Sequence, residues 1–237
     1  MGLFSITFEL LSESFQAMKR ASSFCSMLKK ILFHFSSEYY WSDLFGLILS
    51  VLFRPKNVWT SRLIVWKNNG KVEAGTLIIG MSSNRLGLTP FSRGIVEVEK
   101  GGIITAGKGV RIAHGCKIFV HGRLEIGSGT YVNPHCHLVV HQSVKIGSNC
   151  AIGWNFQAMD TDLHQLKPAD GPWQDSNKPI VVGDHVWIGA NVTICKGVVI
   201  GDGAVVATGS VVTKNVDPGT LVAGVPARLV RENVEWR

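Results

Sequence analysis

The stretch that decides the fold runs Val182-Gly-Asp-His-Val186-Trp, Ile188-Gly-Ala-Asn-Val192-Thr, Ile194-Cys-Lys-Gly-Val198-Val, Ile200-Gly-Asp-Gly-Ala204-Val, Val206-Ala-Thr-Gly-Ser210-Val and Val212-Thr-Lys-Asn-Val216-Asp. An aliphatic residue begins every six-residue unit, and the fifth position is always Val, Ala or Ser. A period of six fits neither a helix face nor an alternating strand. Self-similarity at a fixed period indicates a stacked solenoid.

The simplest geometry for this repeat is a triangular coil. Each hexad supplies one short strand and one corner, so three hexads close a turn of about 18 residues around an aliphatic axis. The pattern continues upstream to about Ile95, with a slip after Leu124 and another after Leu138. Upstream hexads begin at Ile112, Ile126, Val132 and Ile146.

One long segment interrupts the repeat. Between Ala158 and Val182 the hexads stop, and afterwards they resume in register. An insertion that preserves the register is expected to project from a corner of the coil as a loop over residues 159–181. Loops carried on rigid scaffolds are where binding and catalytic residues concentrate.

The C-terminal part of the chain resembles a known family. The segments Val186-Trp-Ile-Gly-Ala-Asn-Val192, Gly209-Ser-Val-Val-Thr-Lys214 and Ala223-Gly-Val-Pro-Ala-Arg228 are similar to hexapeptide-repeat acyltransferases, especially the sugar and exopolysaccharide O-acetyltransferases. The resemblance covers about Lys71 to Arg231. It implies a mainly β fold, a left-handed parallel β-helix over residues 61–231 followed by a tail over 232–237. It also implies a homotrimer with active sites between subunits.

The first sixty residues differ in kind. Apolar residues from Phe4 to Phe35 recur at spacings of three, four or seven, which predicts an amphipathic helix. A second apolar segment, Leu44 to Phe53, is too short to span a bilayer, and the features of a secretion signal are missing. We therefore expect a cytoplasmic protein whose N-terminal helical segment, residues 1–60, plugs the coil or packs between subunits. The alternative is peripheral contact of these helices with the inner membrane.

Composition limits the partners. With 237 residues, of which 46% are hydrophobic, the chain can bury a substantial core. A formal charge of +7 favours anionic partners, either the phosphates of coenzyme A or an anionic membrane or polysaccharide. Basic residues are dispersed and no nucleic-acid motif occurs, so we expect no nucleic-acid partner. Cys116, Cys136 and Cys150 occupy small fifth positions, where a reduced thiol acts as a small apolar side chain.

The loop carries the candidate catalytic residues. Acyl transfer to a hydroxyl needs a base, and histidine titrates nearest neutral pH. His164, in Asp160-Thr-Asp-Leu-His164, resembles the place where the family carries its catalytic imidazole. Asp160 or Asp162 is expected to fix the tautomer of this imidazole, and the sequence leaves open which one does so.

The resemblance also implies the substrate-binding residues. Asn133 and His141 would face an acceptor sugar, with Trp173 of the loop as a stacking surface. Ala190 and Thr208 stand at matching corners and would line the groove for the pantetheine of acetyl-CoA. Cations near the far end of this groove would bind the nucleotide phosphates, and a proline would hold the chain against the adenine; these residues are Lys214, Arg228, Arg231 and Pro226.

Other histidines raise the question of a metal. His135, His137 and His141 lie close together, and His121 and His141 occupy similar places, which predicts that they stack on adjacent turns. Zinc bound between coils occurs in carbonic anhydrases with this fold. His135 and His137 flank the inward Cys136 and are expected to point outward, so we expect no metal.

Together these features predict an O-acetyltransferase that moves acetyl from acetyl-CoA to a sugar hydroxyl of a capsular, exopolysaccharide or lipopolysaccharide unit. One alternative is N-acetylation of an amino sugar, for which part of the amine is already unprotonated near neutral pH. The other is a zinc-dependent lyase or a non-catalytic scaffold on the same coil.

Overall fold

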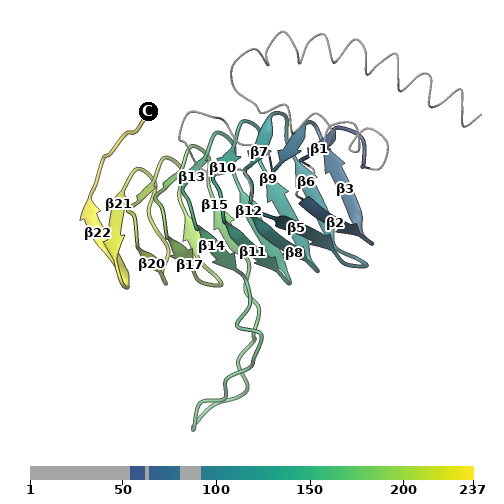
Figure 1. The fold of residues 1–237 in the computed structure, drawn as a ribbon. Coiled ribbons are helices and arrows are strands. Elements are labelled where there is room, and N and C mark those ends of the chain that lie inside the picture. The colour runs from purple at the N-terminus through teal and green to yellow at the C-terminus, as the bar shows by residue number, and fades with distance from the viewer. Residues whose placement is uncertain (1–53, 62–63, 81–91) are drawn as a thin grey trace, which may run out of the picture.

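The computed structural model describes residues 54–61, 64–80 and 92–237. These residues form strands and connecting corners that wind into one parallel β-helix (Figure 1). The helices expected within residues 1–53 lie outside the described residues. No helix among the residues that the structure describes has the length and hydropathy of a membrane span.

Three sheets form the walls of the coil. Sheet A contains nine strands, sheet B seven and sheet C six. Sheet A consists of β1 (Val58–Thr60), β4 (Leu77–Ile79), β7 (Val110–Ile112), β10 (Tyr131–Val132), β13 (Ala151–Ile152), β16 (Trp187–Ile188), β19 (Val205–Val206), β21 (Leu221–Gly224) and β22 (Ala227–Arg231). Sheet B consists of β2 (Ile64–Asn68), β5 (Gly94–Val98), β8 (Lys117–Val120), β11 (His137–Val140), β14 (Gln157–Met159), β17 (Thr193–Ile194) and β20 (Val211–Val212). Sheet C consists of β3 (Lys71–Ala74), β6 (Ile103–Ala106), β9 (Arg123–Ile126), β12 (Ser143–Ile146), β15 (Ile180–Val182) and β18 (Val199–Ile200).

The predicted solenoid is confirmed by the strand pairing. Each strand pairs in parallel with the strand one turn away, and only β22 folds back to pair antiparallel, on β21. Within the described residues, the first strand of the coil is β1, which starts at Val58. Its left-handedness stays a prediction.

The repeat predicts the core correctly. The residues that open the hexads are at most 1% exposed, and those at the fifth position are at most 6% exposed. Because each rung places these side chains above the previous ones, the apolar axis is continuous. The two ladders are Val182, Ile188, Ile194, Ile200, Val206 and Val212, and Val186, Val192, Val198, Ala204, Ser210 and Val216.

The length of a turn changes along the coil. Trp187 pairs with Val205, so a turn near the C-terminus takes the expected 18 residues. Lys117 pairs with His137, so a turn in the N-terminal half takes 20. The additional residues form two-residue corners between sheets B and C, at 121–122 and 141–142. The slip expected after Leu138 agrees with the corner at 141–142. The slip expected after Leu124 is misplaced by a few residues, because the corner at 121–122 precedes this leucine.

Two corners of the coil rely on left-handed backbone. One residue at each of these corners has a positive φ angle on successive turns, and every one of them is Gly, Asn or His. Glycine has no Cβ to clash in this conformation, and Asn and His are the side chains most often found there. The two sets are Gly115, His135, Asn155, Asn191 and Gly209, and Gly109, Gly129, Asn149, His185, Gly203 and Gly219.

The coil has three edges, one between each pair of sheets. The groove edge joins sheet A to sheet B and includes residues 189–192 and 207–210. The loop edge joins sheet B to sheet C and includes residues 121–122, 141–142 and 195–198. The tail edge joins sheet C to sheet A and includes residues 183–186 and 201–204.

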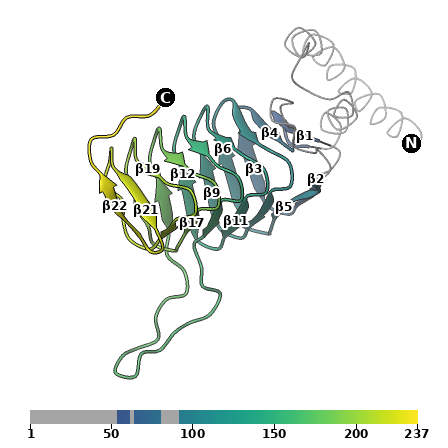
Figure 2. The same ribbon diagram turned by 60° about the vertical axis from the view of Figure 1, so that its left-hand side comes forward.

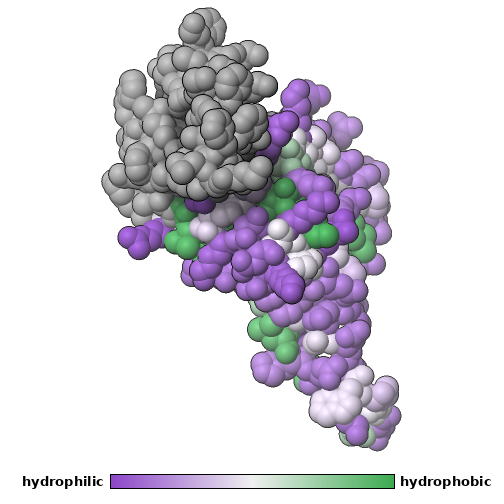
Figure 3. Space-filling model, turned by 90° about the vertical axis from the view of Figure 1, so that its right-hand side faces the viewer, coloured by the Kyte–Doolittle hydropathy of each residue, from purple (hydrophilic) through white to green (hydrophobic). Residues whose placement is uncertain are grey.

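The predicted loop leaves the loop edge between β14 and β15. It comprises residues 160–179, because Met159, Ile180 and Val181 belong to the strands. We call this segment the arm. Figures 1 and 2 show it projecting well away from the coil, and Figure 3 shows both apolar and polar residues on its surface.

Candidate active site

The arm begins as a narrow two-stranded neck. Thr161 forms an antiparallel bridge with Asn177. The amide nitrogen of Asp162 donates to the carbonyl of Ser176 at 2.9 Å, and that of Lys178 donates to the carbonyl of Asp160 at 2.8 Å. These bonds hold the outgoing and returning legs together, so the neck defines where the rest of the arm starts.

Asp160 fixes the root of the arm to the turn below. Its side chain is completely buried. One carboxylate oxygen accepts the amide of His141 at 2.7 Å, and the other accepts the amides of Gln142 at 2.7 Å and Ser143 at 2.6 Å. Backbone donors to a buried carboxylate are strong, charge-assisted hydrogen bonds. The carboxylate therefore provides hydrogen-bond acceptors for the backbone amides of the corner at 141–143.

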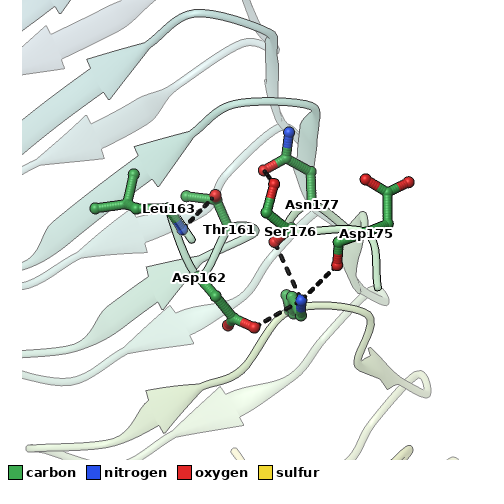
Figure 4. Close-up of polar contacts among 7 residues, drawn as sticks. Thr161, Asp162, Leu163, Asp175, Ser176 and Asn177 are labelled. Atoms are coloured by element: carbon green, nitrogen blue, oxygen red, sulfur yellow. Dashed lines mark hydrogen bonds and ion pairs between the residues drawn. The ribbon is translucent and has the colours of Figure 1, made fainter. Parts of the chain in front are cut away.

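Asp162 is paired with a lysine of the turn above. Its Oδ2 lies 2.6 Å from Nζ of Lys196, in the corner between β17 and β18 (Figure 4). Neither Asp162 nor Asp160 has a polar contact with His164 in the structure. The expectation that an aspartate fixes the tautomer of His164 stays a prediction.

His164 itself is exposed on the arm, just beyond the neck. The neck ends with Leu163, whose amide donates to Oγ1 of Thr161 at 2.9 Å. An exposed imidazole with free nitrogen atoms can take a proton from a substrate hydroxyl that approaches it. His164 is thus accessible to a substrate, and the neck fixes the point from which its segment of the arm extends.

The expected acceptor residues divide between two edges. His141 lies half-buried on the loop edge, next to the root of the arm, and Trp173 is 62% exposed on the arm. Asn133 lies on the groove edge, where its side-chain amide donates to the carbonyl of Ile152 at 2.8 Å. One chain therefore does not bring Asn133 together with His141.

The predicted stacking of His121 on His141 is confirmed. Their ring centroids are 4.5 Å apart, with 35° between the ring planes. Both rings lie on the loop edge, one turn apart, beside the root of the arm.

The expected donor residues lie mainly on the groove edge. Ala190 and Thr208 occupy adjacent turns there, and the amide of Gly209 donates to the carbonyl of Ala190 at 2.8 Å. Gly224, at the end of β21, donates to Oγ of Ser210 at 3.2 Å, which places the following Pro226 near the same edge.

The expected cations are more widely spread. Lys214 is exposed and follows β20, so it lies on the loop edge. Arg228 and Arg231 are exposed on β22. The guanidinium of Arg228 donates to the carbonyl of Ala227 at 2.9 Å. The predicted residues thus do not form one cluster within a single chain.

Buried histidine and cysteine side chains line the interior near these edges. Burial, reinforced by the neighbouring His135, lowers the pKa of His114. Burial raises the pKa of Cys150, which suits a thiol that packs as an apolar group. Cys195 is half-buried on the loop edge, where partial burial and the nearby Asp162 carboxylate raise its pKa. Within residues 54–61, 64–80 and 92–237, no three His, Cys, Asp or Glu side chains gather in a way that could hold a metal ion.

Sequence reasoning missed two features of this region. Lys196 holds the neck of the arm, and the C-terminal Trp236 stacks on His185 of the tail edge with ring centroids 4.3 Å apart. A signal for Lys196 was available, because it lies in the corner that follows the arm by one turn. No signal in the repeat points to the contact of Trp236.

Comparison with known proteins agrees with the repeat and the fold. A family model described as "Hexapeptide repeat of succinyl-transferase" matches residues 179–214. Galactoside O-acetyltransferase of Escherichia coli is 38% identical over 54 residues, which are 23% of this chain and 27% of that protein. A 2,3,4,5-tetrahydropyridine-2,6-dicarboxylate N-acetyltransferase of Halalkalibacterium halodurans is 61% identical over 57 residues, 24% of each chain. The matches to curated relatives span from 24% to 38% of those proteins.

A solved structure resembles most of the chain. The polysialic acid O-acetyltransferase OatWY aligns with a TM-score of 0.58 and 23% identity, covering 76% of this chain and 86% of that one. At this identity the likeness shows the fold. In its repeat segment and in its fold, the chain is thus similar to acyltransferases that carry hexapeptide repeats.

Proposed function

We propose that the protein is an O-acetyltransferase that moves an acetyl group from acetyl-CoA to a hydroxyl of a saccharide, within a capsular, exopolysaccharide or lipopolysaccharide unit. The observation that carries the proposal is the exposed His164, held on an arm whose neck is fixed to the coil by Asp160 and Lys196. The sugar O-acetyltransferases among the similar proteins supply the substrate class.

In the proposed reaction His164 acts as general base. It takes the proton of the sugar hydroxyl as the hydroxyl oxygen attacks the thioester carbonyl carbon. A carbon–oxygen bond forms, the carbon–sulfur bond breaks, and the proton on His164 passes to the leaving sulfur to give the free thiol. General acid–base catalysis of this kind contributes about 10²–10⁴ in rate.

The residues of the groove edge fit the donor. Ala190 and Thr208 have small side chains, and a Cβ on Gly189 would lie 2.6 Å from the amide nitrogen of Thr208, so neighbouring turns meet closely here. Such an edge leaves backbone groups accessible to an extended pantetheine chain. The exposed guanidinium groups of Arg228 and Arg231 can pair with the nucleotide phosphates.

We further propose a homotrimer with active sites between subunits. His164 projects from the loop edge, whereas Ala190 and Thr208 lie on the groove edge, at the other side of sheet B. A site that uses both sets of residues is more easily built from two copies. Leu166 and Trp173, 65% and 62% exposed on the arm, offer apolar surface for such a contact.

The test is the release of free thiol from acetyl-CoA across a panel of sugars and capsular oligosaccharides. We expect acceptor-dependent release by the wild type and a loss of about 10²–10⁴ in His164→Ala, because the base is gone. Binding of coenzyme A is expected to stay unchanged in this variant. Gln165→Ala, a change at the adjacent exposed position, is the matched control and is expected to keep full turnover. Wild-type turnover in His164→Ala would refute the assignment.

N-acetylation of an amino sugar is the second candidate. The 57-residue match at 61% identity to an N-acetyltransferase favours it. Amino sugars in the same panel distinguish the two reactions, because an amine acceptor that is partly unprotonated near neutral pH depends less on a base. Turnover of amino sugars that survives His164→Ala would select this candidate.

A further inference from the structure

We infer that Lys196 is a positioning residue that holds the arm, and with it His164, in a fixed place relative to the coil. This inference rests on the proposed function, in which His164 is the base. Lys196 comes from a different turn of the coil than the residues that it contacts, and it lies in the corner between β17 and β18.

The ammonium group of Lys196 reaches both legs of the neck (Figure 4). Nζ lies 2.6 Å from Oδ2 of Asp162 on the outgoing leg. It also donates to the carbonyl of Asp175 at 2.7 Å and to that of Ser176 at 3.2 Å on the returning leg. An ammonium has three donors, and all three are used here.

The surroundings make this contact stronger than an ordinary surface ion pair. The side chain of Lys196 is only 17% exposed, whereas that of Asp162 is 47% exposed. An exposed pair alone would contribute little. The backbone carbonyls of Asp175 and Ser176 accept hydrogen bonds from the same ammonium. Removing the ammonium would therefore deprive both carbonyls of a charge-assisted donor.

The arm is attached to the coil on two sides, and Lys196 provides the second attachment. Asp160 joins its root to the turn below, through the amides of residues 141–143. Lys196 and the bond from the amide of Gly197 to the carbonyl of Lys178, 3.1 Å, join the neck to the turn above. His164 follows Asp162 by two residues, so a shift of the neck would move the imidazole with it.

The expected consequence is kinetic. Displacing a catalytic group by about 1 Å can cost about 100-fold in rate. Every hydrogen-bond donor of Lys196 is used within the protein, so none is left for the substrate. A loss of rate on replacing Lys196 is therefore explained by displacement of His164. Its removal is expected to reduce kcat and to leave the KM for acetyl-CoA unchanged.

The experiment compares Lys196→Met, Lys196→Arg and Asp162→Asn with Lys178→Met as the matched control. Lys178 is an exposed lysine on the same neck, whose side chain makes no polar contact within the described residues. We expect Lys196→Met to lower kcat by roughly 10- to 100-fold, Lys196→Arg to recover most of it, and Lys178→Met to behave as wild type. Combining Lys196→Met with Asp162→Asn is expected to cost less than the sum of the two single changes, because both remove the same contact.

Hydrogen exchange of the amides of Asp162 and Lys178 supplies a readout that does not require activity. Both amides are hydrogen-bonded across the neck, and their exchange is expected to become faster in Lys196→Met. If no acceptor is turned over by the wild type, the proposed function fails while this measurement still tests the hold on the arm. Should Lys196→Met not fold, Asp162→Asn, a change at an exposed side chain, serves for the same comparison. Unchanged exchange, or a raised KM for acetyl-CoA with unchanged kcat, overturns the inference.

Discussion

At the scale of single residues, Asp160 and Asp162 show how environment separates two similar side chains. Asp160 lies on the inward ladder of sheet B, in the row of Val120 and Val140, yet it is completely buried as a carboxylate. Such a group is tolerated only if donors replace its water, and three backbone amides do so. Asp162, two residues later, lies outside and pairs with Lys196.

Asp160→Asn is therefore expected to destabilise the protein. An amide has one acceptor oxygen, so at least one of the three backbone donors would lose its partner, which costs about 1–3 kcal/mol. Equilibrium unfolding in urea measures the loss. Asp175→Asn is the matched control, because within the part of the chain that the structure describes Asp175 is hydrogen-bonded through its backbone carbonyl and not through its side chain. The free energy of unfolding of this variant is expected to stay unchanged. Equal stability of the two variants would contradict this account of Asp160.

At the scale of elements, the hexads predict strands and inward positions because both depend on local side-chain size and period. Ile188, Val192 and Ile194 are buried as the repeat requires. The length of a turn was harder to predict, because an added pair such as His121 and Gly122 changes a corner without changing the strands beside it. The partners of Asp160 and Asp162 were not predictable, since they come from other turns and depend on the register of the whole coil.

The C-terminal tail is an element that the repeat does not explain. The indole of Trp236 stacks on His185 with 10° between the ring planes, and its Nε1 donates to the carbonyl of His185 at 2.8 Å. The amide of Val234 donates to the carbonyl of Gly219 at 2.9 Å. These contacts attach the tail, residues 232–237, to the tail edge of the coil.

Trp236→Ala is expected to lower the free energy of unfolding by about 1–2 kcal/mol, through the lost stacking and the lost hydrogen bond. Thermal and urea unfolding measure the change. Trp173→Ala is the matched control, because Trp173 is 62% exposed on the arm. If both variants unfold like the wild type, the tail does not contribute to stability.

At the scale of the whole molecule, the arrangement of edges decides how the site can be assembled. The repeat predicts that Ala190 and Thr208 stack, and the resemblance supplies His164, yet neither specifies the edge from which the arm leaves. The structure gives that information: the arm follows sheet B and the groove precedes it. Residues that are expected to serve one reaction thus lie at different edges of one chain.

If the active site is shared between subunits, two inactive variants should complement each other, which a site within one subunit would not allow. Ala190→Trp, which would fill the groove edge, and His164→Ala, which removes the base, are each expected to be inactive as pure proteins. When the two variants are co-expressed, mixed trimers are expected to contain some sites with an intact histidine from one subunit and an intact groove from another. Thiol release should then reappear in the mixed protein, at a mass three times the 25.8 kDa of the chain by sedimentation. Mixed trimers without any recovered activity would place the complete site within one subunit.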